Sequence, residues 1–291
     1  MGEKMTLEFI CWDVQHGSAS YIKTPNGKQI VYDFGTGSYQ ENSSVFSPLL
    51  HLKNNYGVNS LDFAIVSHPH KDHIDDILNF DKLSPTTFLR PRHLERSEIL
   101  NNVKDTDKPL FEKYFEINDR YNQSVPEGTS TLLAKNNGGV EFQTFIPSNC
   151  SQSNINNHSV VVSISYANSK ILLTGDNEAP SWKELLENPQ FIEAIRDTDI
   201  LLAPHHGRDS GFYSDLFKYF NPRLTIISDS DVCDTSATDR YRAVTKGWTI
   251  HHRKGGDETR YCVTTRNDGP IKVSLGIRED DKKPFISVSI D

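Results

Sequence analysis

The sequence predicts an α/β protein in which two mixed β-sheets pack face to face and helices cover both outer faces. Three observations predict this αββα sandwich. Short apolar segments of strand length alternate with helical segments in both halves of the 291-residue chain. Polar residues suited to chemistry follow the carboxyl ends of these strands, where several side chains can converge on one cleft. A chain of this length can also bury a substantial core.

The first half of the chain is expected to contain four strands and one helix. The turn Pro-Asn-Gly-Lys at 25–28 is a strong hairpin signal between the second and third strands. The helix is expected over 47–56, because Pro48 suits a first helical turn. The expected strands are residues 7–14, 19–24, 29–32 and 61–66.

The second half follows a segment where the pattern loosens, from about residue 81 to 128. We interpret this segment as an insertion that lies over the core of a single domain spanning 1–291, with a helical patch at 110–121. Strand-like alternation resumes at residue 140 and continues to the end. The expected strands are 140–146, 159–166, 170–174, 199–203 and 224–228, the helices are 181–187, 189–196, 214–220 and 239–245, and two last strands meet at 267–269.

Composition limits the classes of function. A net charge of −8 argues against a surface that coats nucleic acid, although divalent metals can hold a phosphodiester on an acidic protein. No apolar run is long enough to span a membrane, and the N-terminus lacks a signal pattern. The four cysteines are scattered without paired spacing, so we expect neither a disulfide framework nor a zinc knuckle. The expected location is the cytoplasm.

The most informative stretch is 67–73, Ser-His-Pro-His-Lys-Asp-His, directly after an expected buried strand. His68 and His70 are two residues apart, so in an extended chain their side chains point the same way. Asp72 and His73 fall where the chain turns into a helix and can serve a second position nearby. Neutral imidazole and carboxylate together suit zinc, manganese or iron. The stretch therefore predicts a metal site.

Other strand ends supply further candidate residues. In chain order these are Asp13, Asp33, His158, Asp176 and the pair His205-His206. With the histidine cluster, they resemble the metallo-β-lactamase superfamily over nearly the whole chain apart from the insertion. Within that superfamily the chain is most similar to the soluble hydrolase domain of the bacterial competence protein that imports DNA (ComEC-like). The closer match is carried by Asp-Val-Gln-His-Gly-Ser at 13–18, Asn-Asn-His-Ser at 156–159, Leu-Leu-Thr-Gly-Asp at 172–176 and Ala-Pro-His-His-Gly at 203–207.

The resemblance implies a metallo-β-lactamase fold with two divalent metal ions, Zn²⁺ or alternatively Mn²⁺. Asn157 is the substitute ligand if His158 turns away. The terminal ligand is either His205 or His206. We prefer His206 because a His-Gly step fits the superfamily, and His205 would then support a ligand or donate a proton. The implied ligands are His68, His70 and His158 at the first position, Asp72, His73 and the terminal histidine at the second, and Asp176 between them.

Several residues are expected to support the ligands. Asp13 and Asp33 would accept N–H bonds from ligand imidazoles, or they would only stabilise turns before glycine. Asp72, besides ligating, can orient an attacking hydroxide formed from a water held between two cations. The basic run that contains Arg90, Arg92 and Arg96 would contact backbone phosphates, or it is a solvated loop with local ion pairs.

The function expected from these features is a metal-dependent phosphodiesterase, a nuclease that cleaves nucleic acid, with DNA favoured. A hydrolase of a small carbonyl substrate (a thioester, lactone or β-lactam) or of a signalling nucleotide is the alternative, and a non-catalytic scaffold is the third. The competence-type Tyr-Gly-His-Pro phrase is absent after Ile227, which leaves the substrate open. The expected partner is nucleic acid and not a membrane, and the expected setting is a defence or DNA-processing system.

Overall fold

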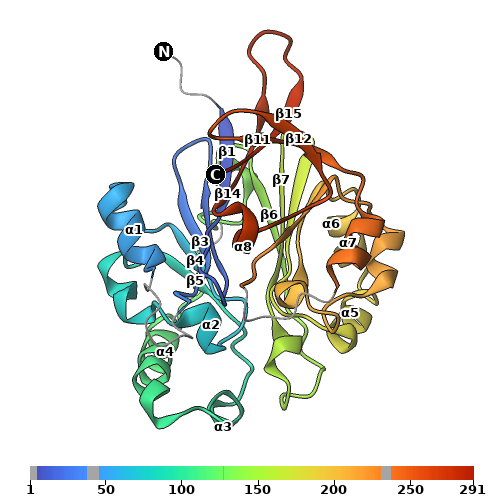
Figure 1. Cartoon of the computed structure of the whole chain (residues 1–291). Coiled ribbons are helices and arrows are strands. Elements are labelled where there is room, and N and C mark those ends of the chain that lie inside the picture. The colour runs from blue at the N-terminus through green and yellow to red at the C-terminus, as the bar shows by residue number, and fades with distance from the viewer. Residues whose placement is uncertain (1–4, 38–45, 127, 231–236) are drawn as a thin grey trace.

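The computed structural model describes residues 5–37, 46–126, 128–230 and 237–291. Two sheets pack face to face, and helices lie on both outer faces (Figure 1). In spatial order the larger sheet contains β12 (Asp257–Arg260), β11 (Trp248–His252), β15 (Pro284–Ile290), β14 (Ile271–Ile277), β1 (Thr6–Cys11), β2 (Ala19–Lys23), β3 (Gln29–Phe34), β4 (Phe63–Ile65) and β5 (Thr87–Leu89). The smaller sheet contains β13 (Cys262–Thr264), β10 (Leu224–Ile227), β9 (Ile200–Leu202), β8 (Ser169–Leu173), β7 (Val161–Tyr166) and β6 (Glu141–Phe145). The predicted αββα sandwich is confirmed.

Both sheets are mixed, and their parallel parts position the polar loops. In the larger sheet β3, β4 and β5 run parallel, and in the smaller sheet β8, β9, β10 and β13 run parallel. The remaining strands are mostly antiparallel neighbours, such as β6 and β7. Because parallel strands end at the same edge, the loops after β3, β4, β8 and β9 gather on one side of the sandwich.

The main core lies between the two sheets and follows the alternation of the strands. In β1, Leu7 and Phe9 are fully buried in this core, whereas Ile10 belongs to the layer between sheet and helices. Leu173 of β8 and Leu202 of β9 pack from the other sheet. Each side chain of this size contributes about 1.5–3 kcal/mol when fully buried, so this interface supplies much of the fold's stability.

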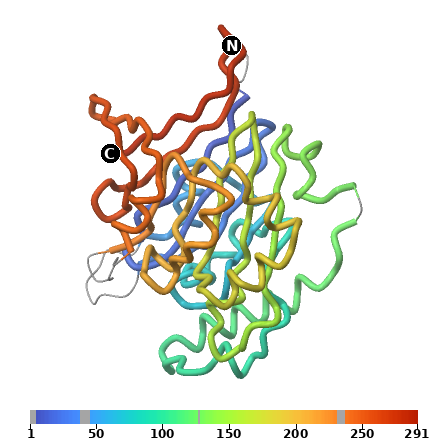
Figure 2. Tube along the Cα trace, turned by 90° about the vertical axis from the view of Figure 1, so that its right-hand side faces the viewer, coloured from blue at the N-terminus to red at the C-terminus, as the bar shows by residue number. Residues whose placement is uncertain are grey.

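Two helical layers close the sandwich. On the larger sheet lie α1 (Pro48–Asn55) and α4 (Lys108–Arg120), which bury Leu52 and Tyr114 among others. On the smaller sheet lie α5 (Ala179–Leu185), α6 (Pro189–Ile195) and α7 (Thr238–Val244), whose Trp182, Phe191 and Tyr241 are buried. Figure 1 shows the two layers on opposite sides, and Figure 2 views the molecule with the layer on the smaller sheet in front. The short helices are α2 (Lys71–Ile74), α3 (Arg96–Ile99) and α8 (Thr265–Asp268).

Short 3₁₀-helices lie between these elements. They are η1 (Ile77–Lys82), η2 (Asp105–Asp107), η3 (Ala134–Asn136), η4 (Ile155–His158), η5 (Pro204–Gly207) and η6 (Ser214–Lys218). The structure contains no helix, within the ranges given above, that is long and apolar enough to cross a lipid bilayer.

A buried carboxylate fixes the start of α1. Ser47 is the N-cap, and its hydroxyl accepts from Leu50 N at 3.1 Å. Asp76 in turn accepts from Ser47 Oγ and Leu49 N, both at 2.8 Å, and from the amide of Asn79 at 2.7 Å. Burial raises the pKa of Asp76 to about 6, although these hydrogen bonds oppose the shift. The expected helix at 47–56 is therefore present, and its first turn is tied to the loop that follows α2.

Two segments differ from expectation. The loosened stretch at 81–128 includes β5, which pairs with β4, so residues 87–89 belong to the larger sheet. Near the C-terminus the structure has β11 to β15, whereas only two closing strands were expected, and residues 265–268 form α8. Cys11, Cys150 and Cys262 form no disulfide, and Cys233 lies outside the described residues.

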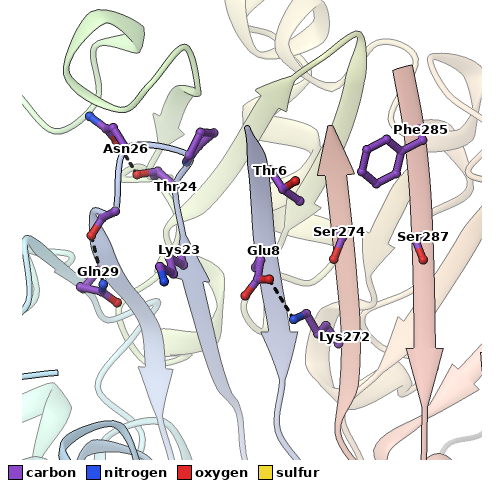
Figure 3. A pocket seen from close by; sticks show the side chains of 12 residues that line it. Thr6, Glu8, Lys23, Thr24, Asn26, Gln29, Lys272, Ser274, Phe285 and Ser287 are labelled. Carbon is purple, nitrogen blue, oxygen red and sulfur yellow. Dashed lines mark hydrogen bonds and ion pairs between the residues drawn. The ribbon is translucent and has the colours of Figure 1, made fainter. Parts of the chain in front are cut away.

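A groove of about 680 Å³ lies on the polar face of the larger sheet (Figure 3). Thr6, Glu8, Lys23 and Lys272 point into it, and Glu8 pairs with Lys272 at 2.9 Å. The groove is at the amino end of β1, so it lies away from the loops after β3 and β4. It contains none of the residues that the sequence singled out for chemistry.

Candidate metal centre

The loop after β4 carries the histidine cluster and is fixed by one buried aspartate. Asp33, at the end of β3, accepts from Ser67 N at 2.7 Å and from Ser67 Oγ at 2.8 Å. Ser67 O also accepts from Val160 N of the other sheet at 2.8 Å. Asp33 is fully buried and has a φ of 56°, a left-handed conformation that Asp adopts more readily than most residues. The loop is thus anchored to both sheets.

Two further loops bring Asp176 and His206 to the same place. Gly175 follows β8 with a φ of 54°, and an added Cβ would lie 2.6 Å from Ser159 Cβ, so only glycine fits. Asp176 N then donates to Ser159 Oγ at 3.0 Å. After β9, His205 and His206 both have positive φ (50° and 53°), which turns the chain sharply and directs His206 inward.

Five side chains form two overlapping groups of three possible metal ligands. In each group one donor atom of every residue lies within 4.8 Å of the others, and all five residues are buried. His73 Nε2 is 3.4 Å from Asp176 Oδ1, and His206 Nε2 is 3.3 Å from Asp72 Oδ2 and 3.6 Å from Asp176 Oδ2. The groups are His68, His73 and Asp176, and Asp72, His73 and His206.

Hydrogen bonds at Nδ1 orient three imidazoles. His73 Nδ1 lies 2.8 Å from Asp33 Oδ2, His206 Nδ1 lies 2.9 Å from Ser228 O, and His158 Nδ1 lies 3.2 Å from Pro147 O. Each acceptor favours the tautomer with the proton on Nδ1, as in metal-ligating histidines. The Nε2 atom of each ring is buried and has no hydrogen-bond partner among the described residues. Such atoms are rare in folded proteins, and a metal ion satisfies them.

The electrostatics of the cluster also suit a cation. Burial raises the pKa of Asp72, but the neighbouring imidazoles of His73 and His206 outweigh it, so the pKa is lowered. Burial lowers the pKa of His73, but the carboxylates of Asp176 and Asp33 outweigh it, so the pKa is raised. Protonated histidine thus balances the buried carboxylates, and a divalent cation would supply the same charge. The residues present therefore fit a metal.

The first position expected from the sequence is less assembled. His68 Nε2 contacts His70 Nδ1 at 2.8 Å and lies 4.0 Å from Asp176 Oδ2. His68 Nδ1 lies 3.1 Å from the hydroxyls of Ser67 and Ser159. His158 belongs to neither group of three, and its Nδ1 also contacts His93 Nε2 at 2.8 Å. The structure brings His68 and His70 together and leaves His158 outside both groups, with its Nε2 unpartnered among the described residues.

The two adjacent histidines after β9 have different surroundings. His206 Nε2 faces Asp72 and Asp176, as given above. His205 Nδ1 lies 3.0 Å from Glu178 Oε1 and 2.8 Å from Ser210 Oγ, and its Nε2 is 3.9 Å from Asp176 Oδ2. This geometry favours His206 as the ligand and places His205 at the rim of the cluster.

Asp13 and Asn157 have local roles. Asp13 Oδ1 accepts from Gln15 N at 3.0 Å, which is the turn-stabilising alternative, and no contact with an imidazole is found for it within the described part of the chain. Asn157 Oδ1 accepts from Glu178 N at 3.1 Å and from Ser181 Oγ at 3.0 Å, so it organises the start of α5. The Oδ1 atom of Asn157 therefore already accepts two hydrogen bonds from α5 and its N-cap, so this atom is not available to replace His158 as a ligand.

The basic run does not form a common phosphate site. Arg90 is 3% exposed and donates to Phe88 O, Asn118 Oδ1, Asn118 O and Tyr121 O. It cannot reach a phosphate without breaking these bonds, so the expectation for Arg90 is wrong. Arg96 pairs with Asp119 at 2.6 Å, which matches the alternative of local ion pairs. Arg92 is exposed.

Sequence reasoning did not assign three residues that contact the cluster. Glu178 holds His205, and His93 contacts His158, as described above. His16 Nε2 lies 3.4 Å from Asp72 Oδ2. The only sequence signal for His16 was its loop after an expected strand, which allowed it either to reach the cleft or to cap the loop.

Known proteins resemble this chain in sequence and, more weakly, in structure. The chain matches no protein-family model. It is 29% identical to the uncharacterized protein YcaI of Escherichia coli over 75% of its length, and 27% identical to recombination protein 2 of Haemophilus influenzae over 77%. It spans 24% of the length of each relative, about a quarter. Among solved structures, a long-form RNase Z from yeast shares 16% identity at a TM-score of 0.38, covering 79% of this chain and 38% of that one. The two mixed sheets and outer helices are those expected from the sequence.

Proposed function

We propose that the protein is a metal-dependent hydrolase that cleaves phosphodiester bonds of nucleic acid, with DNA as the favoured substrate. The observation that carries the proposal is the set of three buried, unpartnered Nε2 atoms on His73, His158 and His206. Each of these rings is oriented by a hydrogen bond at Nδ1, and two of them face the carboxylates of Asp72 and Asp176.

The proposed ligands follow the expected two-metal pattern. Asp72, His73 and His206 would hold one divalent cation, and Asp176 would contact both. The second cation would need the His68–His70 contact to open, because those two rings now share a short contact. Imidazole-rich sites suit zinc, and manganese is the alternative. The ligands of this second cation would be His68, His70 and His158.

Two bound cations would lower the pKa of a water molecule towards neutrality and stabilise the negative charge that develops on phosphorus oxygens. Asp72 would orient the attacking water, since one of its oxygens lies among three imidazoles. His205 would give a proton to the leaving oxygen. Glu178 would hold the His205 ring for this transfer, because its carboxylate lies 3.0 Å from Nδ1.

Two findings support a nucleic-acid substrate over a small carbonyl compound. The competence-type phrases at 13–18, 156–159, 172–176 and 203–207 each contribute a residue that lies in the cluster or contacts it, namely His16, Ser159, Asp176 and His206. Similarity to recombination protein 2 of Haemophilus influenzae also supports a nucleic-acid substrate. The net charge of −8 favours the alternative, a thioester, lactone or β-lactam hydrolase, because a nuclease usually attracts its substrate with positive charge.

We also propose the setting in which this activity operates. The chain would act in the cytoplasm as a single domain, with the segment after β5 as its insertion. Its partner would be nucleic acid, within a defence or DNA-processing system. Arg92, which is exposed, remains the residue of the basic run best placed to contact a phosphate.

A substrate panel tests the proposal. Purified protein is analysed for bound metal and then incubated, with Zn²⁺ or Mn²⁺ separately, with single-stranded DNA, duplex DNA, RNA, a small phosphodiester and a lactone. We expect phosphodiester cleavage that is lost in D72A and D176A. E178Q and H205N should lower the rate of cleavage about 10²–10⁴-fold while bound metal stays unchanged. Cleavage of the lactone without cleavage of any phosphodiester would refute the nuclease proposal.

A further inference from the structure

The loop after β1 brings one more imidazole to the cluster. His16 Nε2 lies 3.4 Å from Asp72 Oδ2, and the same oxygen lies 3.3 Å from His206 Nε2. The ring centroids of His16 and His206 are 5.4 Å apart, close to the 5.3 Å between His73 and His206. We infer that His16 is a fourth protein ligand of the metal position formed by Asp72, His73 and His206. The inference rests on the proposed function, because it requires metal at this cluster.

The distances suit a shared ion. With zinc–ligand bonds of about 2.1 Å, two ligand atoms on a tetrahedral ion lie about 3.4 Å apart. His16 and His206 both meet this spacing from one oxygen of Asp72. His16 is not in the group whose donor atoms all lie within 4.8 Å of one another, so its ring would move towards the other two imidazoles when metal binds. His16 is also partly buried, with 15% of its side chain exposed, so its ring is held within the cleft instead of extending into solvent.

Backbone contacts hold the loop that carries His16 against Asp72. Ser18 N donates to Asp72 O at 3.0 Å. A Cβ on Gly17 would lie 2.7 Å from the same carbonyl oxygen, so the loop can approach this closely only with glycine there. Gln15 adopts a φ of 56° and donates from its N–H to Asp13, which closes the turn. The backbone of His16 is therefore held beside Asp72 by contacts on both sides of it.

A fourth protein ligand would change which metal this position prefers. Three imidazoles and a carboxylate suit zinc or iron better than magnesium or manganese, which prefer oxygen ligands. The competing explanation is that His16 only donates a hydrogen bond to Asp72. The two explanations differ in what can replace the ring: a hydrogen-bond donor can be replaced by an amide, whereas a ligand is best replaced by free imidazole.

Cobalt titration of the metal-free protein distinguishes these explanations. Binding is measured by calorimetry and by the visible absorption of Co²⁺, which reports the number and kind of ligands. For the wild-type protein we expect two equivalents. For H16A and H16Q we expect one equivalent to be unchanged and the other to bind about 10–100-fold more weakly with altered absorption. Added imidazole should restore the wild-type spectrum in H16A. Q15N, in the same loop, is the control and should bind both equivalents normally.

The outcomes separate the inference from the proposed function. Wild-type protein that binds no cobalt would overturn both. Wild-type cobalt affinity and absorption in H16A would overturn the inference alone. Wild-type cobalt affinity and absorption in H16Q would also overturn it, because an amide could then replace the imidazole. D72A serves as the reference for a lost ligand, because it should weaken the same equivalent whether or not His16 ligates.

Discussion

Replacing Asp33 by Asn tests how the protein prepares its metal ligands. Asp33 accepts from the backbone and hydroxyl of Ser67 and from His73 Nδ1 at 2.8 Å. An Asn side chain can keep one of these acceptor roles, but its NH₂ group must face a donor. Asn also tolerates the left-handed backbone at this position, so the substitution adds little strain.

The expected effect is a change of tautomer in His73. With an NH₂ group facing Nδ1, the proton moves to Nε2, and that nitrogen can no longer ligate. Loss of such a supporting group typically weakens metal binding 10–100-fold, which corresponds to about 1.4–2.8 kcal/mol. The unpaired donors should also lower the free energy of unfolding of the metal-free protein by about 1–3 kcal/mol.

The assay combines metal titration with urea denaturation of the metal-free protein. D62N is the matched control, because Asp62 accepts from Lys28 Nζ and Gln29 N at 2.8 Å and is remote from the cluster. D62N should bind metal like the wild-type protein. Wild-type metal affinity in a folded D33N would refute the reasoning, because it would mean that His73 does not depend on Asp33 for its tautomer.

Three more predictions concern stability. The pKa of Asp76 is raised to about 6, so Asp76 contributes stability that is present below its unfolded pKa of about 3.9 and is lost as pH rises through 6. The free energy of unfolding should fall by about 3 kcal/mol over this range. Urea denaturation of metal-free D76N should show a smaller fall than the wild-type protein between pH 4 and 7, and an equal fall would contradict this prediction. Leu173→Ala should lower the free energy of unfolding by about 2–5 kcal/mol, measured in the same way, because Leu173 is fully buried between the sheets. R90M should lower the free energy of unfolding by about 3 kcal/mol or more, because it leaves carbonyl oxygens unpaired. R92M should change it by less than about 0.5 kcal/mol. Equal effects of the two substitutions would contradict the buried role of Arg90.

Local patterns explain which parts of the fold were predictable. The inner strands of both sheets are apolar runs bounded by turn residues, and the histidine cluster follows one of them. By contrast, β12 is Asp-Glu-Thr-Arg, a fully polar edge strand that pairs with β11, and no alternation marks it. β12 forms because it pairs with β11, and the periodicity of its own residues does not indicate that pairing.

The limits at the site have a different cause. Arg90 looked like a phosphate contact because a charged residue in a basic run is usually solvated. Its actual role depends on carbonyl oxygens at the end of α4, which only tertiary packing brings within reach. His16 could not be assigned for a similar reason, since its proximity to Asp72 is set by the turn through Gln15 and Gly17.

The position of β1 has a consequence for how the chain folds. β1 is the first strand of the chain, yet it lies inside the larger sheet between β2 and β14, from Thr6 opposite Gly276 to Cys11 opposite Ile271. During synthesis, one edge of β1 therefore remains unpaired until the C-terminal strands have emerged from the ribosome. Contacts between such distant segments slow folding, and an open strand edge invites pairing with other chains. We therefore expect nascent or truncated chains that lack β14 to depend on chaperones to avoid aggregation.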